Sequence, residues 1–235
     1  ARDHVRAELG QALAAPLRAA IDANQTPGAY SPDPVSAGRR DMKNLALNYL
    51  MAGGDADSQA IATAQYAQAG NMTDRMAALS ALVNHGSGQA AAKALDDFYQ
   101  RWQNDPLVVD KWFALQATAR TATVDSVRQL MQHPAFTLRN PNRARALVFQ
   151  FCLNNPRAFH AESGEGHRFW AEQVLALDAL NPEIAARLAR GLEQWTRYTP
   201  ALRQSMQTAL VGVRQHSGLS RNVTEIVSKA LEISA

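Results

Sequence analysis

The sequence contains one cysteine in 235 residues, few aromatic residues and no long apolar run. Because Cys152 has no second cysteine to pair with, the fold has no internal disulfide framework, a usage typical of a reducing compartment. No apolar run approaches the ~20 residues that span a bilayer, and the first residues do not resemble a signal peptide. We therefore expect a cytoplasmic protein without membrane contact, in which Cys152 is a buried, unreactive thiol.

The chain also lacks a strong charge of either sign. Lys and Arg total 24 against 21 acidic residues, which gives a formal net charge of +3. Nucleic-acid binders concentrate basic residues in a patch or stripe. The arginines here are spread along the chain, apart from Arg39-Arg40 and the group Arg139, Arg143 and Arg145. This distribution argues against a nucleic-acid partner.

What the chain does contain is a repeated signal for helix starts. Five of its ten prolines follow a residue that can cap a helix, because the capping side chain accepts from free N–H groups and proline at the next position loses no bond. Amphipathic segments separate these signals at intervals of about 17–20 residues, so a helix pair takes about 35–40 residues. The pattern predicts an all-α superhelical solenoid of antiparallel helix pairs, HEAT/ARM-like, within a single domain of residues 1–235. The five dipeptides are Asp105-Pro106, Asn140-Pro141, Asn155-Pro156, Asn181-Pro182 and Thr199-Pro200.

Apolar spacing places individual helices and their expected core faces. Residues 3–23 are predicted to form one helix bent at Pro16, followed by a Pro- and Gly-rich loop over residues 26–34. Asn71 with Asp74 and Asn222 with Glu225 resemble helix caps. Three stripes are expected to face the core: Val5, Leu9, Leu13, Leu17 and Ile21; Met42, Leu45, Ala46, Tyr49 and Leu50; and Ile184, Leu188, Leu192 and Trp195.

Catalytic patterns are missing from the sequence. There is no pair of histidines at i, i+4 with a glutamate between them, no phosphate-binding glycine motif and no Gly-x-Ser-x-Gly. The nearest metal-like cluster is His160, Glu162, Glu165 and His167, whose spacing is that of a loop. We expect no catalytic centre and no metal in this chain. Arg145 and Arg187 lie off the predicted packing stripes and could hold a carboxylate bidentately, although the residues alone favour ordinary surface arginines.

Several ordered blocks resemble the C-terminal region of bacterial aminopeptidase N, of the zinc-dependent M1 family of alanyl aminopeptidases. These blocks are spread from about residue 28 to the end of the chain. They are residues 71–80, 109–117, 140–145 and 155–162, with Gly38-Arg39-Arg40, Asn44 and Tyr49-Leu50.

The resemblance implies a non-catalytic, excised α-helical domain that caps the catalytic domain and encloses the active-site chamber, in an enzyme that hydrolyses N-terminal residues from peptides. It implies that the zinc motif lies upstream, in a catalytic domain that would be this chain's partner. It also implies that Arg145 and Arg187 face the chamber and contact the peptide substrate, with Glu183 standing where relatives carry glutamine. His167 likewise replaces an aromatic residue.

Three alternatives remain open at this stage. One is a stand-alone α-solenoid that binds a partner protein. The chain starts at Ala1 without an initiator methionine, which favours an excised fragment over this alternative. Another is a helical-repeat RNA binder, which would need a basic stripe recurring in each pair. The third is a metalloenzyme that uses His160 and His167.

Overall fold

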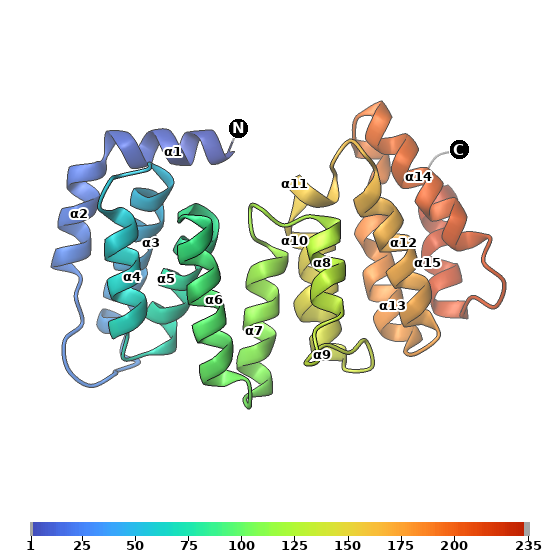
Figure 1. Cartoon of the computed structure of the whole chain (residues 1–235). Coiled ribbons are helices and arrows are strands. Elements are labelled where there is room, and N and C mark those ends of the chain that lie inside the picture. Colours follow the sequence, from blue (N-terminus) through green and yellow to red (C-terminus); the bar gives the residue numbers. More distant parts are fainter. Residues whose placement is uncertain (1, 233–235) are drawn as a thin grey trace. The chain divides into compact units, whose positions relative to one another are not determined.

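The computed structural model describes residues 2–232, and every regular element among them is a helix (Figure 1). This result confirms the all-α class. Contacts divide the chain into two compact units, which meet between Trp102 and Gln103. The first unit contains α1 (Arg2–Ala12), α2 (Ala14–Ala23), α3 (Pro34–Ala52), α4 (Ser58–Gln68), α5 (Met72–His85) and α6 (Gly88–Trp102).

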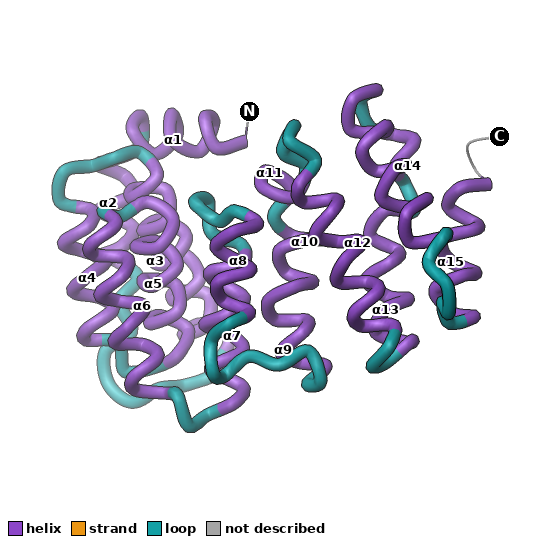
Figure 2. The backbone as a smooth tube through the Cα atoms, turned by 45° about the vertical axis from the view of Figure 1, so that its right-hand side comes forward, coloured by secondary structure: helices purple, strands orange, loops and turns teal. Residues whose placement is uncertain are grey.

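The second unit combines helices of up to 15 residues with short helical turns (Figure 2). A π turn (Arg145–Phe149) and two 3₁₀ turns (Arg190–Leu192 and Trp195–Arg197) interrupt its helices. Its α-helices are α7 (Pro106–Ala117), α8 (Val124–Met131), α9 (Pro141–Ala144), α10 (Gln150–Asn154), α11 (Pro156–Phe159), α12 (Glu165–Asp178), α13 (Pro182–Ala189), α14 (Pro200–Arg214) and α15 (Arg221–Glu232).

All five predicted capping dipeptides begin helices. The side chains of Asp105, Asn140, Asn155 and Asn181 accept hydrogen bonds from the first free N–H groups, whereas the Thr199 side chain makes no such bond. A sixth signal was assigned to a loop and is in fact a helix start. Asp33 accepts from the backbone N–H groups of Val35 and Ser36, both at 3.0 Å, and Pro34 opens α3.

The prediction of one bent helix over residues 3–23 is wrong. The chain breaks at Leu13 into α1 and α2, and α1 lies across the ends of the other helices of its unit (Figure 1). Pro16 explains the break, because its ring excludes the carbonyl of residue 12 from a continuous helix. A Cβ on Gly10 would collide with the Tyr49 carbonyl oxygen, so glycine allows α1 to cross the end of α3 this closely.

Two of the three predicted stripes are only partly buried. Val5, Leu9 and Leu13 are exposed, and so are Met42 and Leu45. The third stripe is correct, since Ile184, Leu188, Leu192 and Trp195 are all buried.

One predicted cap is misplaced. Asn222 lies inside α15 rather than before it, since the helix starts at Arg221. The capping group is the Ser220 hydroxyl, which accepts from the Val223 N–H at 3.3 Å. Asp178 orients that hydroxyl by accepting its proton at 2.5 Å and the Ser220 N–H at 2.8 Å. The predicted cap of Asn71 on the Asp74 N–H is present at 2.9 Å.

Candidate anion-binding end of the second unit

Arg145 is held at the start of the π turn. Asn140 caps the N–H groups of Asn142 and Arg143, which fixes the first turn of α9. The Asn142 side-chain oxygen then accepts a hydrogen bond from Arg145 Nη1 at 3.3 Å. The Arg145 side chain is half-buried and forms no ion pair with any other residue of the described chain. Its charge is therefore available to an outside anion.

Arg187 and Glu183 lie one turn apart on α13, and both are exposed. Asn181 caps this helix through the Ile184 N–H at 3.2 Å. The spacing from Glu183 to Arg187 would allow an i, i+4 pair, but the two side chains form no ion pair. Within residues 2–232, Arg187 also has no other carboxylate partner.

The two helix starts lie beside each other. A cavity of about 150 Å³ is lined by residues preceding and opening α9, by the end of α12 and by the first turn of α13. Both helices begin with Asn-Pro at this cavity, and Arg145 and Arg187 each lie about one turn further along their helices. Positive helix ends and guanidinium groups both favour anions. The lining residues are Leu138, Arg139, Pro141, Leu177, Leu180, Asn181 and Ile184.

Arg139 is the residue that sequence reasoning did not single out here. It is exposed, lines this cavity and forms no ion pair among the described residues. The sequence could have indicated this residue, because Arg139 lies in the turn between Thr137 and Asn140 that leads directly into the α9 cap.

Some other arginines of the unit pair with carboxylates. Arg143 lies 3.1 Å from Asp110 with both side chains nearly buried, and its guanidinium stacks over the Phe113 ring. Burial raises the pKa of the Asp110 carboxyl, against the opposing charge of Arg143. Arg128 contacts Glu172 at 2.6 Å in a more exposed pair. Arg143 and Arg128 are thus paired with carboxylates, whereas Arg139, Arg145 and Arg187 have no carboxylate partner among residues 2–232.

His160 and His167 contact each other, as the metalloenzyme alternative requires, but three of their four ring nitrogens already have a partner. His160 Nδ1 lies 3.0 Å from His167 Nε2, and His167 Nδ1 lies 2.8 Å from the Ser205 hydroxyl. Burial, then His160 and Arg168, lower the pKa of His167 to about 4. Among residues 2–232, no three His, Cys, Asp or Glu side chains converge on a possible metal position. The donor set therefore does not fit zinc.

Two further features carry no chemistry of their own. Cys152 is buried as predicted, and burial raises the pKa of its thiol. In the first unit, a polar-lined cavity of about 830 Å³ lies between α2, the loop after it, α3 and α4. Its cations are mostly engaged, for example Lys43 with Asp74 at 2.8 Å.

None of the described helices combines the length and the apolarity that crossing a membrane requires.

Comparison with known proteins identifies the family. Residues 1–232 match a family described as "Domain of unknown function (DUF3458_C) ARM repeats". The chain belongs to this family. The ARM-repeat description agrees with the predicted helical solenoid.

Curated relatives named Aminopeptidase N match the same stretch in their C-terminal part. The protein from Caulobacter vibrioides is 41% identical over 98% of this chain and 27% of its own length. That from Escherichia coli K12 is 36% identical over 98% of this chain and 26% of its own. The chain thus spans about a quarter of the length of these relatives and corresponds to a C-terminal segment of an aminopeptidase.

A solved structure shows the same fold. The structure titled Legionella pneumophila aminopeptidase A in complex with aspartic acid superposes with a TM-score of 0.89 at 29% identity. The match covers 99% of this chain and 28% of that chain. Sequence and structure comparisons therefore agree on the family that the residue blocks suggested.

Proposed function

We propose that this chain is the non-catalytic C-terminal capping domain of an aminopeptidase N, with residues 1–235 forming one domain. In this proposal it closes the active-site chamber of an enzyme that releases N-terminal amino acids from peptides. The hydrolysis belongs to the upstream catalytic domain of the same cytoplasmic polypeptide, which holds the zinc. Its partners are that domain and the peptide, and no nucleic acid or membrane takes part.

The observation that carries the proposal is a group of arginines without carboxylate partners at one end of the second unit. Arg145 and Arg187 lie about one turn beyond two adjacent Asn-Pro helix starts, and neither has a carboxylate partner in the described chain. A peptide bound by its N-terminus presents its carboxylate several residues away. Unpaired guanidinium groups suit that carboxylate because charge-assisted, bidentate bonds are stronger than neutral ones.

Glu183 gives the same surface a negative charge next to Arg187. In this proposal it contacts the peptide backbone or a basic side chain and limits how acidic a bound peptide can be. Like charges repel, so replacing Glu183 by Gln should improve KM for peptides with acidic residues near their C-terminus. Neutral peptides should change less.

The test uses the full-length enzyme with Arg145→Ala and Arg187→Ala. Loss of a hydrogen-bonded charge contact should raise KM for tri- and tetrapeptides roughly 10-fold. Hydrolysis of alanine p-nitroanilide, which has no distal carboxylate, should keep its kcat and KM. Arg221→Ala, which removes an exposed arginine from α15, is the matched control. An equal effect on both substrate classes would refute the contact.

A further inference from the structure

The solvent-facing side of α3 has an apolar centre. The side chains of Val35, Met42 and Leu45 are 66%, 49% and 54% exposed. Together with Gly38 and the half-buried Tyr49, they recur at alternating steps of three and four residues. This spacing puts all five positions on one side of a helix, in the pattern of a coiled-coil seam. We refer to these five residues as the α3 stripe.

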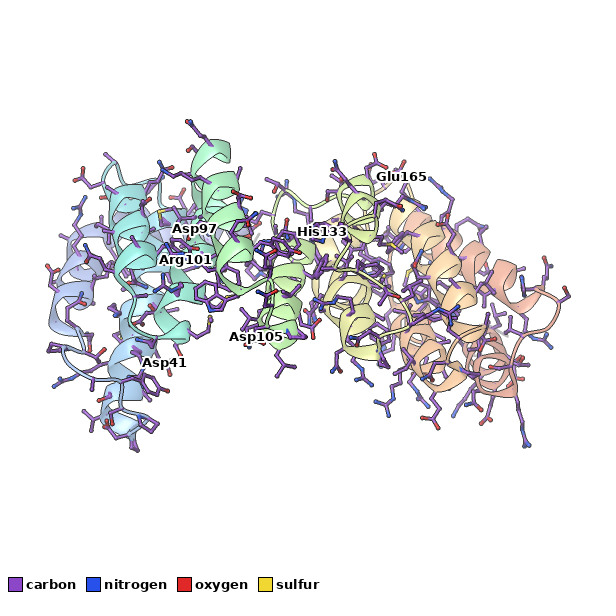
Figure 3. All side chains as sticks on the ribbon, turned by 60° about the horizontal axis from the view of Figure 1, so that its bottom comes forward. Asp41, Asp97, Arg101, Asp105, His133 and Glu165 are labelled. Atoms are coloured by element: carbon purple, nitrogen blue, oxygen red, sulfur yellow. The ribbon has the colours of Figure 1, made fainter. Side chains whose placement is uncertain are left out.

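Charged residues flank the α3 stripe on both sides. At 3.6 residues per turn, Arg39 falls on one flank and Asp41 on the other. Both side chains are exposed, and neither forms an ion pair with another residue of the described chain. Asp41 belongs to the first unit, where Figure 3 labels it. The face thus has an apolar centre and a charge of each sign at its edges.

The last helix of the described chain, α15, has a polar solvent-facing side. The exposed residues of α15 are all charged or polar: Arg221, Asn222, Glu225, Lys229 and Glu232. Arrays of stacked helices need such polar outer faces at their ends to remain soluble. The α3 stripe lacks this polar character, which is typical of a surface that another layer covers.

We propose that the α3 stripe is the docking surface for an amphipathic helix from the same polypeptide, supplied by the part that precedes residue 1. This inference rests on the proposed function, in which the chain is one portion of a longer protein. The relatives match this chain through only 26–27% of their length, in their C-terminal part, so most of their residues lie upstream.

The stripe also specifies the chemistry of that helix. Apolar side chains at a three- and four-residue spacing would fill the seam between Val35, Met42 and Leu45. Gly38 presents no side chain, so the partner's backbone can approach there closely. An acidic residue should face Arg39 and a basic residue should face Asp41, which fixes the direction and register of the helix. From residue 35 to residue 49 the seam is ~21 Å long.

Photo-crosslinking in the full-length polypeptide tests the proposal. p-Benzoylphenylalanine replaces Leu45 in the seam, and in a matched control it replaces Glu225 on the polar face of α15. After irradiation, mass spectrometry locates the joined peptide. The expected product from position 45 is an intramolecular link to a segment upstream of residue 1 that has the apolar spacing described. Position 225 should give no link to that segment.

Other products from position 45 overturn the proposal. A link between two copies of the chain would show that the face is a dimer interface. A link to another protein would identify a separate partner, and no product beyond the control level would show that the face stays open.

Cysteine labelling gives a second measurement that does not depend on crosslinking efficiency. Because Cys152 is buried, a cysteine introduced as Leu45→Cys is the accessible thiol of residues 1–235, and mass spectrometry of the peptide that contains position 45 follows its labelling. Its reaction with a maleimide should be at least 10-fold slower in the full-length polypeptide than in the chain of residues 1–235. Glu225→Cys should react equally fast in both. Equal rates for Leu45→Cys would contradict docking. Neither measurement uses a peptide substrate, so this inference and the arginine contacts can fail separately.

Discussion

The buried histidine pair predicts a specific loss of stability in acid. His167 is fully buried, and burial, then the neighbouring His160 and Arg168, lower its pKa from 6.5 to about 4. When the chain unfolds, His167 regains its ordinary pKa. Between pH 6.5 and pH 4 it then binds a proton that it does not bind in the folded state. The stability is therefore complete above pH 6.5 and falls as the pH drops from 6.5 towards 4.

The size of this effect follows from the two pKa values. At pH 4.5 the unfolded state gains about 2.6 kcal/mol from protonating His167, and at pH 7 it gains about 0.2 kcal/mol. The wild-type protein should thus lose about 2.4 kcal/mol of stability between these pH values through this one residue. Replacing His167 by Gln removes the titration and keeps a side chain that can bond to Ser205 or His160.

Urea unfolding at pH 7, 6, 5 and 4.5 measures the difference. A Trp102→Phe background leaves Trp112, Trp170 and Trp195 as fluorescence probes, all in the second unit. At pH 7, His167→Gln should cost about 1 kcal/mol through imperfect hydrogen bonding. Between pH 7 and pH 4.5 the variant should then lose about 2 kcal/mol less stability than the wild type.

The control is His216→Gln, which changes an exposed histidine of the same unit and should keep the wild-type pH dependence. If His167→Gln and the wild type lost stability in parallel across this range, the buried neutral imidazole could not be the cause. The reasoning from burial to acid sensitivity would then be wrong.

Two further predictions concern the interior of each unit. In the first, Lys43→Met should cost about 3–5 kcal/mol in urea unfolding at pH 7, because it leaves the Asp74 carboxylate buried without its cation. A cost below 1 kcal/mol would mean that Asn44 and Asn71 stabilise the buried carboxylate without the lysine. In the second, Phe151→Ala should cost about 3–5 kcal/mol, because this fully buried ring packs edge-on against Phe159 and Phe169. The control for Lys43→Met is Arg101→Ala, which breaks the exposed pair with Asp97 on α6 of the first unit (Figure 3) and should cost less than 1 kcal/mol.

Local chemistry made the helix starts readable from the sequence. An Asx side chain followed by proline satisfies the first N–H groups whatever surrounds the helix, so Asn140-Pro141 and Asn181-Pro182 could be recognised in isolation. Asp33-Pro34 was missed because Pro27, Gly28 and Pro32 precede it and give the stretch the composition of a loop. The error lay in weighing the neighbourhood above the cap itself.

Burial could not be predicted in the same way. The α3 stripe has the spacing of a core face, and the sequence cannot say whether the surface that covers it belongs to this chain. The contact between the histidine pair and Ser205 could not be predicted either. His160 and His167 are near in sequence, but Ser205, which completes the hydrogen-bonded row, is 38 residues further along. Such contacts arise from tertiary packing and leave no local pattern.

The π turn shows how core packing determines the position of the candidate peptide contact. Buried residues between positions 143 and 152 come in three groups that recur about every four residues: 143 and 144, 146 to 148, and 151 and 152. An α-helix has 3.6 residues per turn, so a period of four would drift off the packing face. The π turn (Arg145–Phe149) closes i→i+5 bonds, including the Gln150 N–H to the Arg145 carbonyl, and lengthens the local period.

The longer period keeps all three groups against the core, while Arg145 lies between the first two and is only half-buried. Arg143, two residues earlier, consequently faces inward to Asp110, while Arg145 stays unpaired and half-buried. Two arginines that look equivalent in the sequence thus take opposite roles, one neutralised in the core and one held at the surface. The same backbone feature that satisfies the core therefore makes Arg145 available to bind an anion.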